Sequence, residues 1–290
     1  MRIATNYLHT TMLNRMQQAN VDLSKTSAQI SSGLVAQRFE DIAADSSTLL
    51  TLQDLKLNTD QYIQNMDTAN GRLKASENAL QGMMDLIVEA ANLWTLGRNE
   101  NSAEVRASLA PKAEGLTRSF FSLLQTQFDG RFVFSGMAGE QSPITVAPTA
   151  NTFPGDPPPT AYYTGDTQKS VVITSPANSQ EYGVTGDHMA FARMKAGFET
   201  LWFGLQNNNV ADIDGAIDLL NQAQEDLSGL LGEVGGQQSG FDLLMTRHEN
   251  ANLFLTERVD DIEKVDIAEA MTRFSQEQSM LEASMVMIQR

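Results

Sequence analysis

The sequence lacks cysteine entirely and has only three histidines among its 290 residues. Without cysteine there are no disulfide bonds, thiolate metal sites or cysteine nucleophiles. The histidines are His9, His188 and His248, and none has the close helical spacing of a zinc motif. We therefore predict no metal site and no cofactor.

Long apolar segments are also missing. No run of about 18 apolar residues occurs, so we expect no membrane insertion. The N-terminal stretch "MRIATNYLHTTMLNRM" contains Arg2 but no continuous apolar core of a secretory signal peptide. If the protein leaves the cell, we expect an export route without a cleaved signal peptide.

Basic residues are scarce relative to acidic ones. The chain has 20 Lys and Arg against 36 Asp and Glu, a formal net charge of −16. Phosphate groups repel such a chain, so we expect no nucleic-acid partner. The simplest role of the excess charge is to keep the protein soluble.

Catalytic motifs are not evident. No phosphate-binding loop, dinucleotide fingerprint or nucleophile elbow occurs in a strand–helix context. The acidic cluster of Glu40, Asp41 and Asp45 precedes a predicted helix, where carboxylates are favoured by unpaired backbone N–H groups. We therefore predict that the protein is not an enzyme.

What the sequence does contain is long helical periodicity. No proline occurs before Pro111. Alternating steps of three and four place apolar or small residues on one helical face from Leu52 to Trp94. A helix from about Ser46 to Leu96 would be roughly 75 Å long, which is typical of coiled coils and long bundles.

Both ends of the chain repeat this heptad pattern, because apolar groups every 3.5 residues form a seam along one face. Asp266 is a candidate N-cap for the C-terminal helix, with Asp260 and Asp261 as competitors. Neither end can bury its seam alone, so we expect the two ends to pair with each other or with other copies. The predicted terminal seam consists of Met12, Met16, Ala19, Leu23, Ile30, Ile267, Met271, Phe274, Leu281, Met285 and Ile288.

The remaining helices and a β-rich insert lie between these ends. We expect a helix over 103–128 with Val105 facing inward, and one near 213–231 that "GEVGGQQSG" interrupts before helix resumes at 244–259. Seven of the eight prolines lie between Pro143 and Pro176, and "RFVF" and "VVIT" read as strands. The fold class is therefore mainly α with a small β-rich insert.

Several stretches jointly resemble the flagellin superfamily. They are "QISSGL" with the acidic link "FEDIAADSS", the C-terminal "DIAEAMTRFSQEQSMLEASMVMIQ", the strand entry "DGRFVFSGMAGEQSPI" and the opening "MRIATNY". The last two look more like the members that join the flagellar hook to the filament than like filament flagellin. The chain stops at Arg290, where relatives usually carry several more residues.

The resemblance implies an elongated rod of long antiparallel helices, with terminal helices that pair in a coiled-coil layer. It implies three parts: a terminal layer of 1–38 with 258–290, disordered in the free monomer, a helical rod of 39–129 with 190–257, and an outer β-rich domain of 130–189. Ser31, Ser32 and Gly33 would form the joint between the terminal layer and the rod. Glycine supplies a backbone conformation that other residues resist, and serines compete for nearby backbone bonds.

The implied function is a secreted structural subunit of the bacterial flagellum. Its implied partners are copies of itself, a neighbouring hook-associated protein, flagellin and an export chaperone. Filament flagellin remains the nearest alternative, because it shares both ends. A soluble signalling coiled-coil scaffold is more remote, since the β-rich insert and the two-ended design argue against it.

Overall fold

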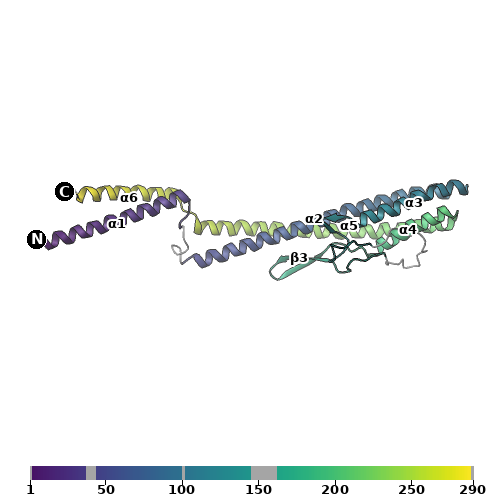
Figure 1. Cartoon of the computed structure of the whole chain (residues 1–290), viewed down its shortest axis with the longest axis horizontal. Coiled ribbons are helices and arrows are strands. Elements are labelled where there is room, and N and C mark those ends of the chain that lie inside the picture. Colours follow the sequence, from purple (N-terminus) through teal and green to yellow (C-terminus); the bar gives the residue numbers. More distant parts are fainter. Residues whose placement is uncertain (1, 37–43, 100–101, 145–161, 289–290) are drawn as a thin grey trace. The chain divides into compact units, whose positions relative to one another are not determined.

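The computed structural model describes residues 2–36, 44–99, 102–144 and 162–288 (Figure 1). Within these residues the chain forms α-helices and two small antiparallel sheets of two strands each. The helices are α1 (Arg2–Ser32), α2 (Ser46–Asn99), α3 (Ala103–Leu124), α4 (Met189–Gln206), α5 (Val210–Glu263) and α6 (Ile267–Ile288). The strands are β1 (Gln127–Phe128), β2 (Arg131–Phe132), β3 (Ser170–Ser175) and β4 (Asn178–Tyr182). The predicted fold class, mainly α with a small β-rich insert, is confirmed.

The chain divides into two compact units. The smaller unit contains residues 1–60 and 250–290, and the larger unit contains 61–249. Helices α2 and α5 each supply residues to both units. The division into three parts stays a prediction, and its first boundary, at 38/39, lies outside the described residues.

Helix α2 follows the predicted periodicity closely. It has 54 residues and begins at Ser46, as expected, but ends three residues later than expected, at Asn99. The heptad positions from Met66 to Ala90 are all buried, which confirms that this face packs inward. These positions are Met66, Ala69, Leu73, Ser76, Leu80, Met83, Ile87 and Ala90.

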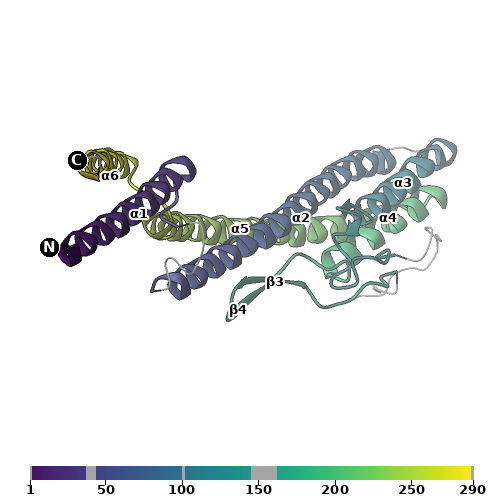
Figure 2. The ribbon, with the colours of Figure 1, turned by 60° about the vertical axis from the view of Figure 1, so that its left-hand side comes forward.

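The core of the larger unit lies among α2, α3, α4 and α5 (Figure 2). Helix α3 packs against α4, and three fully buried phenylalanines anchor the core. They are Phe120 of α3 and Phe191 and Phe198 of α4. The Phe120 ring meets Phe198 edge-on at 6.3 Å between centroids, a geometry that aromatic pairs favour. Such close packing makes the core sensitive to loss of even a few atoms.

The predicted interruption of the C-terminal helical region is wrong. Helix α5 runs without a break through "GEVGGQQSG". Each glycine costs about 1 kcal/mol relative to alanine in a helix. Val234 lies among the glycines and Phe241 directly follows them, and both are fully buried. Burying such a side chain contributes about 1.5–3 kcal/mol. Tertiary packing therefore outweighs the local preference.

Helix α3 is shorter than predicted, and the first of its expected core positions is exposed, whereas Leu116, Phe120 and Leu124 are buried as expected. It ends at Leu124, and Val105 is 47% exposed instead of facing inward. The chain then turns at Asp129 and Gly130, both with positive φ, and pairs Phe128 with Arg131 across the turn. Asp-Gly is a strong signal for this two-residue hairpin turn. The Asp129-Gly130 dipeptide is therefore the sequence signal that places the end of α3 before residue 128.

The predicted strands "RFVF" and "VVIT" contribute to β2 and β3. In the hairpin of β3 and β4, Val172, Thr174 and Tyr182 are buried, while Val171 and Ile173 are exposed. The imidazole of His248 on α5 is 2.8 Å from the Thr174 carbonyl oxygen. The insert is therefore held against the helices of the larger unit.

Gly136 is the tightest backbone position in the insert. Its φ is +61°, and an added Cβ would lie 2.3 Å from the Asp166 carbonyl oxygen. We expect Gly136→Ala to unfold the insert locally, because the obstructing atoms are backbone and cannot rotate away. Gly183→Ala is the matched control, since Gly183 has φ +89° but open space around it, so it should cost only about 1–2 kcal/mol.

Limited proteolysis would measure this difference. Gly136→Ala should make the insert much more sensitive to cleavage than either the wild type or Gly183→Ala. Equal protection in both variants would contradict the steric argument.

Candidate assembly surfaces and the inter-helix joint

The terminal helices α1 and α6 pack against each other within the smaller unit. Thr26 of α1 is buried, and the predicted α1 positions Met16, Ala19, Leu23 and Ile30 are half-buried. The side chain of Met12 lies outside what the structure describes. The two ends of the chain therefore pair, as the fold prediction required.

On α6 the predicted positions are divided between two faces. Leu281 is buried and Phe274 is half-buried, whereas Ile267, Met271 and Met285 are 44–58% exposed. Ala270, which the seam prediction omitted, is fully buried. The side chain of Ile288 is not among those described. The part these positions play in assembly stays a prediction.

Most of the exposed large apolar side chains in the described residues lie in the smaller unit. They are Leu13, Val21, Leu34, Leu50, Leu55, Leu57, Leu253, Phe254, Ile267, Met271, Met280, Met285 and Val286. Single exposed apolar residues are ordinary, but a concentration of them in one unit is typical of a surface that contacts other proteins.

The predicted joint residues Ser31, Ser32 and Gly33 lie where α1 ends. Gly33 has φ +74°, a conformation that glycine adopts without steric cost. The Ser32 hydroxyl donates to the Ala28 carbonyl oxygen at 2.8 Å and accepts from the Leu34 N–H at 3.2 Å. These contacts cap the helix end in the way that glycine and serine favour.

The chain after this turn is tied to the connection between α5 and α6. The Val35 N–H donates to the Glu263 carbonyl oxygen at 2.8 Å, and the Val265 N–H donates to the Gly33 carbonyl oxygen at 3.0 Å. The Asp266 carboxylate accepts from the Ala268 N–H at 2.9 Å, which confirms it as the N-cap of α6. A short antiparallel bridge thus joins the two inter-helix connections, and sequence patterns gave no signal for it.

Gly33→Ala tests how firmly the joint is held. An alanine Cβ would meet no atom within 4 Å, so only the positive φ opposes it. We expect a cost of about 1–2 kcal/mol, seen as faster hydrogen exchange of the Val35 and Val265 amides. Unchanged exchange at both amides would show that the bridge does not depend on the Gly33 conformation.

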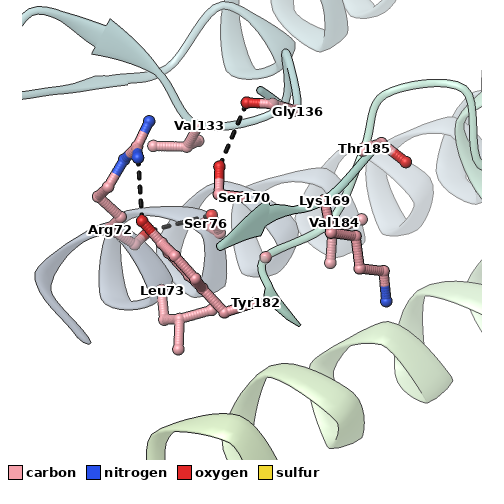
Figure 3. A pocket seen from close by; sticks show the side chains of 11 residues that line it. Arg72, Leu73, Ser76, Val133, Gly136, Lys169, Ser170, Tyr182, Val184 and Thr185 are labelled. Carbon is pink, nitrogen blue, oxygen red and sulfur yellow. Dashed lines mark hydrogen bonds between the residues drawn. The ribbon is translucent and has the colours of Figure 1, made fainter. Parts of the chain in front are cut away.

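The larger unit contains a small cavity where the insert meets α2 (Figure 3). Arg72 and Ser76 come from α2, and the Arg72 guanidinium donates to the Tyr182 hydroxyl at 3.0 Å. The Ser170 hydroxyl donates to the Gly136 carbonyl oxygen at 3.2 Å. The cavity measures about 10 Å³, about the room that one water molecule needs. It is too small for an organic substrate.

Two buried ionisable groups lie elsewhere in the larger unit. Burial raises the pKa of the Glu199 carboxyl above its ordinary value, while the Lys195 ammonium, 2.7 Å away, acts in the opposite direction. Burial, reinforced by the Asp187 carboxylate, raises the pKa of Tyr162. Its neutral hydroxyl donates to the Gly186 carbonyl oxygen at 2.8 Å. Both contacts belong to the packing of the unit.

Across the described ranges, no group of three or more histidine, cysteine or carboxylate side chains is arranged to hold a metal ion. None of the described helices is long and apolar enough to cross a membrane.

Comparison with known proteins identifies the family of the chain. The pattern of the bacterial flagellin N-terminal helical region matches residues 3–138, and that of the C-terminal helical region matches 217–290. No curated protein sequence matches the chain. The matched segments include both terminal helices and both connections at the joint.

Solved structures with the same fold are distant in sequence. A protein from Vibrio parahaemolyticus named as a flagellar hook-associated protein has 18% identity and a TM-score of 0.63, over 77% of this chain and 100% of its own. FlgL of Bacillus cereus has 17% identity and a TM-score of 0.60, over 72% and 99%. FlgL of Xanthomonas campestris has 13% identity and a TM-score of 0.54, over 70% and 98%. At these identities the likeness shows the fold.

Proposed function

Since the chain belongs to the bacterial flagellin superfamily, we propose that it is a structural subunit that joins the flagellar hook to the flagellin filament, the role of hook-associated protein 3. The proposal rests on the combination of the two terminal helical regions with two short sequence stretches. Flagellin-type ends enclose a short β-rich insert that begins with "DGRFVFSG", after an opening of "MRIATNY". These two stretches resemble the junction members of the superfamily more than filament flagellin. The proposed location is the flagellum outside the cell.

The smaller unit is the proposed assembly surface. Ile267, Met271 and Met285 form an exposed apolar stripe on α6 beside the face that covers α1. An isolated helix pair with such a stripe gains stability by burying it against neighbours. The rest of the predicted terminal seam contributes by holding α1 and α6 together, so the layer becomes complete only when copies assemble.

The proposed partners follow from this position in the flagellum. Copies of the chain form one layer, a second hook-associated protein lies on the hook side, and flagellin lies on the filament side. An export chaperone would keep the ends from pairing early, in a chain exported without a cleaved signal peptide. We assign no catalytic activity to the protein.

Deletion of the gene tests this function. We expect hooks without filaments in electron micrographs, together with flagellin subunits released into the medium. Hooks without filaments and without released flagellin would instead identify the protein as the filament subunit. Normal filaments would contradict both assignments, and complementation with the intact gene is the control.

A further inference from the structure

Two guanidinium groups from different elements converge on Gly139 in the insert. An added Cβ at Gly139 would lie 3.1 Å from Nη2 of Arg72 on α2 and 3.0 Å from Nε of Arg131 on β2. Like charges this close repel each other unless an anion lies nearby. The arrangement therefore favours a negatively charged group beside the two side chains.

Neither Arg72 nor Arg131 forms an ion pair with a described carboxylate; Arg72 bonds to the Tyr182 hydroxyl, and Arg131 contacts the Met137 carbonyl oxygen at 3.5 Å. Lys74, Lys112 and Arg247 of the larger unit also lack a described carboxylate partner, so what distinguishes Arg72 and Arg131 is that they lie close together. Several other cations are paired with carboxylates. These pairs are Arg98–Asp214, Arg118–Glu114, Lys169–Glu233, Arg193–Asp226 and Lys195–Glu199.

Hydrogen bonds hold the backbone around Gly139 and one end of Arg72 in place. The Phe132 N–H donates to the Gly139 carbonyl oxygen at 2.7 Å, and the Gln141 N–H donates to the Ala138 carbonyl oxygen at 2.9 Å. Tyr182 fixes one end of Arg72 and leaves its remaining N–H groups available. A site whose groups are already positioned loses less entropy when a partner binds.

The exposed side chain of Met137 extends the surface next to Arg131. Met137 is 50% exposed, and its N–H donates to the Gln168 carbonyl oxygen. Arginine and methionine are enriched at the centres of protein–protein interfaces. The planar guanidinium also matches a carboxylate with two parallel hydrogen bonds.

We propose that Arg72, Arg131 and Met137 form a docking surface for carboxylate side chains of a second copy of this chain. The occupant follows from charge, because each copy carries 36 acidic and 20 basic residues and so presents a predominantly acidic surface. This inference rests on the proposed assembly of copies into a layer. It adds a contact between larger units to the apolar contacts of the smaller units.

Charge reversal of the more exposed arginine tests the proposal. We expect Arg131→Glu to reduce the number of copies per purified hook at least 10-fold, since loss of a partner from a paired charge mainly speeds dissociation. Arg247→Glu is the matched control, because Arg247 is exposed on α5 with no described partner and the charge change is the same. It should leave the number of copies unchanged.

Circular dichroism must show that both purified variants are folded. If Arg131→Glu is unfolded, Arg131→Gln replaces it, and we expect a smaller reduction in the number of copies per hook. If folded Arg131→Glu assembles normally while Leu281→Asp does not, the arginine surface is refuted and the proposed function stands. If deletion of the gene leaves filaments normal, the proposed function fails first.

Cross-linking identifies the occupant. Because the chain has no cysteine, Met137→Cys introduces a unique thiol that can carry a benzophenone cross-linker in intact flagella. We expect an adduct between two copies, located at a peptide that contains Asp or Glu. An adduct only with another protein, or none in fully assembled flagella, would overturn the proposal.

Discussion

Leu281→Asp is expected to abolish assembly of the subunit and leave the larger unit folded. Leu281 is 8% exposed, on the face of α6 that covers α1. Removing a buried leucine costs about 2–5 kcal/mol, and a carboxylate placed there must also lose water. Helices α1 and α6 contact each other more than any other helix, so we expect the pair to separate.

Motility and electron microscopy of cells carrying the variant would measure the loss. Gln276→Asp is the control, because Gln276 is exposed on the same helix. It should assemble normally. Circular dichroism of purified Leu281→Asp should retain most of the helical signal, and complete unfolding would contradict the independence of the larger unit.

Phe120→Ala is expected to destabilise the larger unit by about 3–5 kcal/mol. Phe120 is fully buried, and its ring lies 5.3 Å from Phe121 and 6.3 Å from Phe198. The truncation leaves a cavity between the neighbouring rings, whose packing contacts with Phe120 are lost. Urea unfolding followed by circular dichroism would measure the change in the free energy of unfolding.

The control for this prediction is Val105→Ala on the same helix. Val105 is 47% exposed, so its truncation should change stability by less than about 1 kcal/mol. A similar loss in both variants would mean that the buried phenylalanines do not determine the stability of the larger unit.

The long helices could be predicted from sequence because their periodicity is regular. The α2 positions from Met66 to Ala90 alternate in steps of three and four, and all of them are buried, whereas Leu55, earlier in the same predicted seam, is 48% exposed. Asp266 was recognisable as an N-cap because its carboxylate precedes an apolar periodic segment. Where local preference and packing agree, the hydrophobic pattern is sufficient to predict a helix and its buried face.

The errors arose where packing and local preference disagree. The glycines near Val234 suggested a loop, but the buried neighbours keep α5 helical. On α6 the heptad pattern selected Ile267 and Met271, which are exposed, and missed Ala270, which is buried. A small side chain allows two helices to approach closely, and a hydrophobicity pattern gives it little weight.

Contacts between distant segments were beyond sequence reasoning. The bridge between Leu34 and Lys264 joins segments more than two hundred residues apart through backbone N–H and carbonyl groups, which leave no pattern in the sequence. The convergence of Arg72 and Arg131 depends likewise on how the insert folds onto α2. Only the three-dimensional structure brings such residues together.

The most direct test of the junction role is to locate the protein on intact flagella. Ala177→Cys places a unique thiol in the exposed turn between β3 and β4, and maleimide-gold labelling can then be imaged by electron microscopy, with wild-type flagella as the control. The junction role predicts gold at a single position, between hook and filament. Gold along the whole filament would contradict that role and identify the chain as filament flagellin.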